Sequence, residues 1–379
     1  MFLFERLFGV CVYASTLGMV FVLMAFTAVK PKTVLNLYMV ALCVMGFFYV
    51  PHADGDLYRI YETMEWYSSM ELAHFVENYV VTASVPVARL FYWAVSKTGV
   101  FNLLPVISCA LCYSLIFDII LKTQEKFGIS KMNTALTLLF IMAGSMYSSV
   151  VGGIRMMIAM SLIVHCFFYE SVLQKFRWRH ILFYAIAVFT HNIAVIILAL
   201  RMVLLVLDSQ YKWYIRGMLI LLIAAIGVVM GVAFPGFLLD VIENASGYLT
   251  GESYSDVWEY MMGTLMGIFF IVLAVRFRTY GGSAVFPSIR AYNTGMFLVI
   301  TIAVLFFMVF SIFYRFIGHL APLLAIPMLM TTLQESSRKS PVRFDWFSMQ
   351  GTVLIYSAVL LLLSCSRGSL SSLKFFVLE

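Results

Sequence analysis

The sequence predicts an all-α protein that crosses a membrane many times, and three observations support this fold class. Hydrophobic residues make up 63% of the 379 residues, and the mean hydropathy is +0.96. Charged residues make up only 12%, about half of the roughly 25% usual in soluble proteins. Apolar stretches near the ~20 residues that a spanning helix needs recur along the chain. A soluble enzyme, a nucleic-acid-binding domain and a disordered chain are therefore excluded, because a globule cannot bury so much apolar surface.

The candidate spans follow one another along the whole chain. They are 7–29, 33–50, 102–121, 132–151, 153–169, 181–207, 218–239, 260–275, 292–313, 314–333 and 348–365. Residues 1–29 lack the features of a cleaved signal peptide, so we expect a retained first span. The stretch 82–98 contains Pro86, Arg89 and Lys97, so we expect a short interfacial or re-entrant segment there.

The loops between these stretches separate by charge. Acidic residues dominate 52–81 and 235–259, whereas Lys and Arg concentrate in 30–32, 122–131, 175–179, 212–216, 276–290 and 338–343. Because cytoplasmic loops carry an excess of Lys and Arg, we expect the basic loops to be cytoplasmic and the acidic loops external. Nothing marks a second domain, so we expect a single integral-membrane domain over 1–379.

The stretch 181–207 has basic loops on both sides, so both of its ends should lie on the cytoplasmic side. It is too long for one ordinary span and too short for two full ones. We therefore expect a helical hairpin with short arms and with Thr190, His191 and Asn192 near its turn. The resulting bundle has about eleven to twelve crossings, and both termini are external.

Four charged residues lie inside the predicted spans. Asp118 and Arg201 lie near cytoplasmic ends, so we expect them to reach the interface. Arg155 and Arg315 lie at external helix starts, and a charge at membrane depth normally faces a bundle interior or a water-filled cavity. The planar guanidinium group is well suited to phosphate, so a diphosphate-binding role is one interpretation. The alternatives are contact with the outer interface and pairing with an acid of loop 52–81.

Further candidate residues are expected on the same face. His191 lies at the predicted turn, and His319 follows Arg315 by one helical turn. His165 is expected deep in the bundle, as a core histidine without a predicted acidic partner. Loop 52–81 begins with acids and tyrosines, namely Asp54, Asp56, Tyr58 and Tyr61.

A D-x-D pair such as Asp54 and Asp56 can hold a divalent metal beside a diphosphate. It can equally bind sugar, pair with an arginine or cap the following helix, and we expect a metal-free, cofactor-free site. Arginines would stabilise the leaving diphosphate, and a His or Asp would take the proton of an acceptor hydroxyl. No zinc-protease, Walker or nucleophile-elbow motif is present in the sequence.

At these residues the sequence resembles the EpsG family of Wzy-type bacterial polysaccharide polymerases. The resemblance is carried by four blocks, which are Asp54-Gly-Asp56-Leu-Tyr58 followed by Tyr61, Gly153-Ile-Arg155-Met-Met-Ile-Ala159, Phe189-Thr-His191-Asn192 after Arg177-Trp-Arg179-His180, and Tyr314-Arg315-Phe316. Two features depart from the family pattern: two acids stand where one is expected, and Asn192 stands where a small hydroxyl residue is more usual.

The resemblance implies a GT-C-like bundle in the bacterial inner membrane, with its active site facing the periplasm or exterior. Such enzymes join oligosaccharide repeat units carried on undecaprenyl diphosphate, and their partners are the bilayer, a chain-length regulator and a flippase. An inverting, metal-independent transfer is expected. Arg155 and Arg315 would bind the diphosphate, and His191 would act as base or orient the acceptor. Asp54 or Asp56 would contact sugar or act as base, and the substrate would contact Tyr58, Tyr61, Tyr314 and His319.

Three other functions compete with polymerisation. An O-antigen ligase-like transferase shares the chemistry but is expected to have a longer late external region than 235–259. A lipid-linked sugar transporter or flippase would have charges and helix breaks at mid-membrane in paired halves. A membrane acyltransferase would need a deep His beside an acid, and His165 has no predicted partner.

Overall fold

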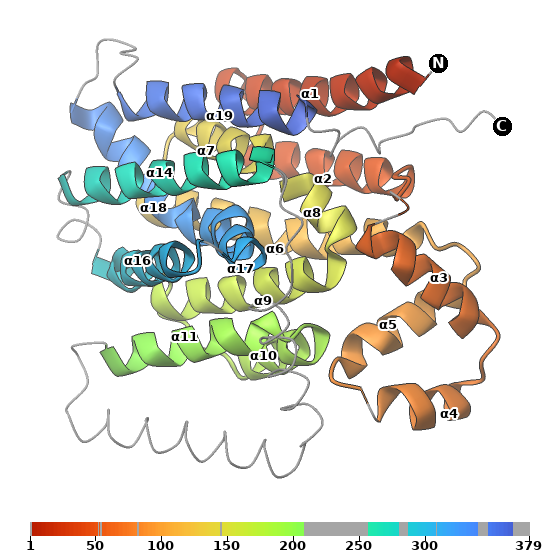
Figure 1. Ribbon diagram of the computed structural model, residues 1–379. Helices are drawn as coiled ribbons and strands as arrows, with labels where there is room; N and C mark the ends of the chain where they lie inside the picture. Colours follow the sequence, from red (N-terminus) through yellow and green to blue (C-terminus); the bar gives the residue numbers. More distant parts are fainter. Residues whose placement is uncertain are drawn as a thin grey trace.

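The computed structural model describes residues 2–51, 53, 55–81, 83–144, 146–207, 257–279, 287–307, 309–339 and 348–366. Within these ranges every regular element is a helix, and there is no β-strand. Most helices lie side by side with their axes in a common direction, which gives one elongated bundle (Figure 1). The prediction of an all-α bundle is therefore confirmed for the described part of the chain.

The helices of the first part are α1 (Phe2–Phe26), α2 (Pro31–Phe47), α3 (Asp56–Ser68), α4 (Leu72–Phe75), the π-helix η1 (Val76–Val80), α5 (Pro86–Ser96), α6 (Leu103–Phe127), α7 (Lys131–Ala143) and α8 (Met146–Gly152). Those that follow are α9 (Ile154–Ser171), α10 (Trp178–Thr190), α11 (Ile193–Leu207), α14 (Val257–Thr279), the 3₁₀-helix η2 (Pro287–Ile289), α16 (Arg290–Leu305), α17 (Phe310–Tyr314), the π-helix η3 (Arg315–Leu320), α18 (Ala321–Lys339) and α19 (Met349–Ser366).

Several of these helices are suited to crossing a membrane. Within the described ranges, five segments are long and apolar enough, namely Phe8–Phe26, Leu103–Phe127, Ile154–Ser171, Tyr260–Thr279 and Ile312–Arg338. The bent pair α7 and α8 makes a sixth if it is one span, and further apolar helices have 10–17 residues. The chain is thus a multi-pass membrane protein, whereas eleven to twelve crossings stay a prediction. The stretch 218–239 and the loop 235–259 lie outside the described residues.

One helical segment forms the centre of the bundle. Ile312–Arg338 runs through α17, η3 and α18 over 27 residues, and its apolar window is completely buried. It packs against α6, α7, α14 and α16. A helix that is apolar all round is stable only when other helices surround it, which this arrangement provides. Arg315 lies near the start of this central segment.

Three of the basic loops, those beginning at 30, 122 and 338, lie near one another at one end of the bundle, which we call the basic end. The basic loop 212–216 lies outside the described residues. The Lys131 ammonium group at the start of α7 donates to the carbonyl groups of Thr27 and Val29, at 3.1 and 3.0 Å. The backbone N–H of Ser130 donates to Gln334 Oε1, near the end of α18, at 2.9 Å. These three loops, which we expect on one side of the membrane, therefore share one end of the fold.

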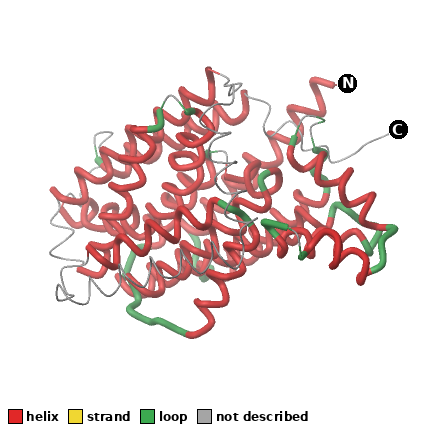
Figure 2. The backbone as a smooth tube through the Cα atoms, turned by 60° about the horizontal axis from the view of Figure 1, so that its bottom comes forward, coloured by secondary structure: helices red, strands yellow, loops and turns green. Residues whose placement is uncertain are grey.

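The opposite end carries helices α3 to α5, which we call the arch (residues 56–96). The arch lies at the edge of the bundle (Figure 1, Figure 2). It is attached through Asn102, which donates from Nδ2 to the Phe47 carbonyl at 2.8 Å and accepts from the Tyr61 hydroxyl at 3.2 Å. Helix α5 has 11 residues and packs on α3, so it is too short to span and agrees with the interfacial segment predicted for 82–98.

The stretch 181–207 forms the predicted hairpin. Glu170, near the end of α9, contacts both arms: its carboxylate accepts from Tyr184 of α10 at 3.0 Å and from Arg201 of α11 at 2.9 Å. His191 and Asn192 connect the arms, and the His191 side chain interacts electrostatically with Arg155 at the start of α9. The prediction that Arg201 reaches the interface was wrong, because Arg201 forms a buried ion pair with Glu170.

Two predicted spans differ from the helices in the structure. The stretch 132–151 is broken into α7 and α8, whose axes differ by 55°. Gly144 ends α7 in an extended conformation, and a Gly-Ser pair is a common site of sharp bends. The spans predicted at 292–313 and 314–333 instead separate after Leu305, so that Ile312–Tyr314 belongs to the central segment.

Candidate functional site

Three of the predicted site residues come together at the arch end. Arg155 is the second residue of α9, His191 lies in the hairpin turn and Arg315 is the first residue of η3. The guanidinium groups of Arg155 and Arg315 both interact electrostatically with the imidazole ring of His191. The three side chains therefore lie in one region of the fold. These residues come from distant parts of the chain, and only the tertiary fold brings them together.

Arg155 lies at the positive end of α9, which adds to its own charge. Gly153 precedes the helix, and a Cβ atom there would lie 3.1 Å from the Ser149 carbonyl oxygen, so the connection from α8 leaves little room for a side chain. No described carboxylate lies within ion-pair distance of Arg155, and Asp56 pairs with Arg59 instead, at 3.4 Å. The positive charge of Arg155 is therefore available to an anion as far as the described acids are concerned.

The arch contributes two groups beside Arg155. The hydroxyl of Tyr92, on α5, lies by the guanidinium group without a hydrogen bond of good geometry to any described residue. Burial raises the pKa of Tyr92 above its ordinary value, although Arg155 opposes this shift, so the hydroxyl remains protonated. Asp56 acts on Tyr92 electrostatically and is 62% exposed, which places its carboxylate at the rim of the group.

The π-helix η3 organises the residues behind Arg315. π-Helical turns are rare and often occur at functional sites. The Tyr314 ring packs edge-to-face on the His319 ring at 4.9 Å, and a Cβ atom at Gly318 would lie 3.1 Å from the Tyr314 ring. His319 is buried, with its Nδ1 3.5 Å from Ser149 Oγ, so it links η3 to α8.

The hydrogen bonding of His191 determines what its ring can do. Nδ1 accepts a hydrogen bond from the backbone N–H of Ile193 at 3.1 Å. A neutral imidazole that accepts at Nδ1 carries its proton on Nε2. The free lone pair that a general base needs is then absent, so this geometry favours an orienting donor over a base. The neighbouring Asn192 Oδ1 is buried and has no donor among the described residues.

The other predicted residues are placed less centrally or not at all. Tyr58 is 40% exposed on α3, and no described contact joins it to the arginines. The hydroxyl of Tyr61 is engaged by Asn102, and its ring packs on Phe101 at 5.8 Å. Asp54 lies outside the described residues. Over the described ranges no group of three or more His, Cys, Asp or Glu side chains could hold a metal ion.

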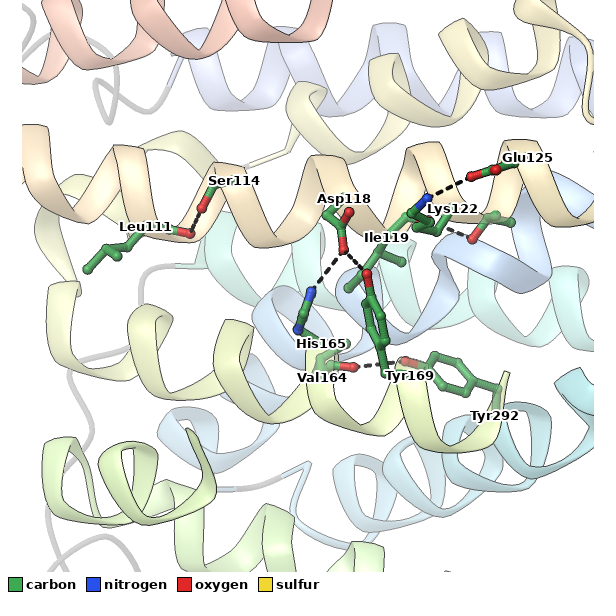
Figure 3. A network of polar contacts seen from close by, with 11 residues as sticks. Leu111, Ser114, Asp118, Ile119, Lys122, Glu125, Val164, His165, Tyr169 and Tyr292 are labelled. Atoms are coloured by element: carbon green, nitrogen blue, oxygen red, sulfur yellow. Dashed lines mark hydrogen bonds and ion pairs between the residues drawn. The ribbon is translucent and has the colours of Figure 1, made fainter. Parts of the chain in front are cut away.

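A second polar network lies away from the arginines, and sequence reasoning missed it. His165 Nε2 lies 3.0 Å from Asp118 Oδ2, and the Tyr169 hydroxyl donates to the same oxygen at 2.8 Å (Figure 3). The expectation that His165 has no acidic partner was wrong, so the deep His beside an acid that a membrane acyltransferase would need is present. Asp118 precedes His165 by many residues and lies on another helix, so no local spacing indicates the pair.

Tyr92 and Ser149 are further site residues that the sequence did not single out, whereas Asn192 was already placed in the predicted turn. Tyr92 had no signal in the sequence, because its place beside Arg155 depends on how α5 packs against α10.

Comparison with known proteins adds no assignment: no protein-family model, no curated protein and no solved structure matches the chain.

Proposed function

We propose that this protein is a membrane glycosyltransferase that polymerises oligosaccharide repeat units carried on undecaprenyl diphosphate. The observation that carries the proposal is the convergence of Arg155, Arg315 and His191 at the arch end. Two guanidinium groups beside a helix N-terminus suit a diphosphate, which carries several negative charges. The sequence resemblance to Wzy-type polymerases supports the same substrate class.

The proposed step is a single displacement at the anomeric carbon of the donor sugar. An acceptor hydroxyl oxygen forms the new glycosidic bond as the bond between the anomeric carbon and the diphosphate oxygen breaks. The electron pair leaves on the diphosphate, where Arg155 and Arg315 stabilise the developing charge. The hydroxyl proton passes to a carboxylate near the start of the arch, and Asp56 and Asp54 are the two candidates for this base. Such a displacement inverts the anomeric configuration.

His191 and Tyr92 are proposed to orient the reactants. His191 offers Nε2–H to a diphosphate or sugar oxygen, since its Nδ1 is already engaged by Ile193. Tyr92 remains protonated, so its hydroxyl can donate to the diphosphate beside Arg155.

The decisive experiment is incubation of the purified protein with lipid-linked repeat units, followed by size analysis of the product. A ladder of sizes supports a polymerase. A single transfer to a different acceptor indicates a ligase-like transferase, and the absence of transfer with movement of substrate across vesicles indicates a transporter or flippase.

Arg155→Ala and Arg315→Ala test the diphosphate role. Each is expected to abolish polymer while the protein remains in the membrane. Arg338→Ala is the matched control, because Arg338 lies at the basic end and pairs with Glu335 at 2.7 Å. Normal polymer from either of the first two variants would remove that arginine from the mechanism.

A further inference from the structure

A polar groove opens at the basic end, between the start of α2 and the end of α6. It has a volume of about 450 Å³, within the roughly 300–1,000 Å³ typical of ligand pockets. Its charged lining residues are Lys30, Lys32, Asp118, Lys122 and Glu125. The groove lies at the opposite end of the bundle from Arg155 and Arg315, so it is separate from the proposed catalytic site.

The charges of this groove are not all balanced within the protein. Lys122 and Glu125 form an ion pair at 2.7 Å and offset each other. The ammonium groups of Lys30 and Lys32 are exposed, and no described carboxylate lies within ion-pair distance of either. They flank the first turn of α2, which has no acidic residue and no side-chain cap, so the helix dipole adds positive potential there.

Asp118 supplies one fixed negative group in the same groove. Both of its hydrogen bonds, from Tyr169 and with His165, are made by Oδ2. Its Oδ1 makes no hydrogen bond with the described residues, and the side chain is 35% exposed. The carboxylate is therefore anchored through one oxygen and presents the other to the groove.

Two free ammonium groups and one anchored carboxylate are complementary to a headgroup that carries both a phosphate and a primary amine. We propose that this groove binds an aminophospholipid of the phosphatidylethanolamine type. The phosphate contacts Lys30 and Lys32 at the start of α2, and the ammonium group donates to Asp118 Oδ1. Basic pockets between spanning helices are recognised headgroup sites, and the carboxylate adds selectivity for the amine.

The surface next to the groove suits the acyl chains. Leu37, Val40 and Val44 lie along the exposed face of α2, beyond Lys32. They form an apolar stripe that runs from the groove towards the other end of the helix, as an acyl chain would when its headgroup occupies the groove.

The test uses the purified, delipidated full chain in detergent, with lipid binding measured by native mass spectrometry. The probes are phosphatidylethanolamine, phosphatidylcholine, phosphatidic acid and inorganic phosphate. We expect phosphatidylethanolamine to bind most tightly. The trimethylated amine of phosphatidylcholine cannot donate a hydrogen bond, and phosphatidic acid has no amine. This comparison needs no variant, so it stands even if a substitution disturbs folding.

Two variants then assign the contacts. Lys30→Gln/Lys32→Gln should weaken phosphatidylethanolamine binding by about tenfold or more, the loss expected when charge-assisted hydrogen bonds are removed. Asp118→Asn should lower phosphatidylethanolamine binding to the level of phosphatidic acid. The control Lys175→Gln, at the same end but outside the groove, should bind like the parent protein.

Three results would overturn the proposal. The first is equal binding of phosphatidylethanolamine, phosphatidylcholine and phosphatidic acid to the parent protein. The second is unchanged lipid binding after loss of both lysines. The third is displacement of the lipid by an equal concentration of inorganic phosphate, which indicates a simple anion site.

Discussion

The buried ion pair between Glu170 and Arg201 gives the sharpest prediction about the hairpin that carries His191. Arg201 donates to Glu170 Oε2 from Nε at 3.2 Å and from Nη2 at 2.9 Å. The two side chains are 12% and 9% exposed, respectively. Arg201→Met removes the guanidinium group but keeps an unbranched apolar chain, so it leaves the Glu170 carboxylate buried without its counter-charge.

The magnitude follows from this geometry. Removing one partner of a buried pair typically costs about 3–5 kcal/mol, because an uncompensated charge remains. Glu170 keeps the hydrogen bond from Tyr184 at 3.0 Å, so we expect the lower part of this range, about 3 kcal/mol. Tyr184→Phe removes one hydrogen bond to a charged acceptor and should cost about 1.5 kcal/mol. Glu170→Gln combined with Arg201→Met should recover part of the loss, since no buried charge remains.

The assay is thermal unfolding of the purified variants in detergent, with transfer activity measured on the same samples. Lys122→Met is the matched control, because its pair with Glu125 is also short, at 2.7 Å, but the two side chains are 42% and 70% exposed. An exposed pair contributes at most about 1 kcal/mol. A loss of stability for Arg201→Met no larger than that for Lys122→Met would refute the reasoning.

Three further predictions concern the site and its packing. His191→Ala should slow transfer about 10²–10³-fold, the loss typical of removing one preorganised donor. Gln, whose amide nitrogen can stand in for Nε2–H, should restore more activity than Asn, and equal loss in both variants would favour a base. Transfer should persist in excess chelator, measured with lipid-linked repeat units, and rescue by a divalent ion would instead give Asp54 and Asp56 a metal-binding role. Gly263→Ala should destabilise the fold, because the new Cβ would lie 2.6 Å from the Phe313 ring, and an unchanged melting temperature would show that this ring moves freely.

The hairpin over 181–207 was predicted from the sequence, but the ion pair that holds it to α9 was not. Basic loops on both sides of 181–207 required the chain to turn back, and the turn lies at His191 and Asn192. Arg201 was assigned to the interface because it lies near the end of its helix. From the sequence, position along the helix is the only indication of how deep a residue lies in the membrane. The partner Glu170 lies on α9, and no local pattern connects the two residues.

Some residues of the candidate site were predicted from the sequence, and others were not. Arg155 and Arg315 were predicted from their unusual position at apolar helix starts, since a charge in an apolar stretch stands out without any structure. Tyr92 and the engaged Nδ1 of His191 were not predicted. A tyrosine among many tyrosines carries no such signal, and hydrogen-bond partners depend on the path of the backbone at the turn.

The class of protein, the sorting of charged loops and the short list of arginines can all be predicted without any structure. These properties follow from composition and local hydropathy, which act on each segment separately. The pairing of polar residues, such as Glu170 with Arg201 and Asp118 with His165, depends instead on how the helices pack. The physical reason is that buried polar groups must find partners wherever helix packing provides them, and packing is a property of the whole bundle.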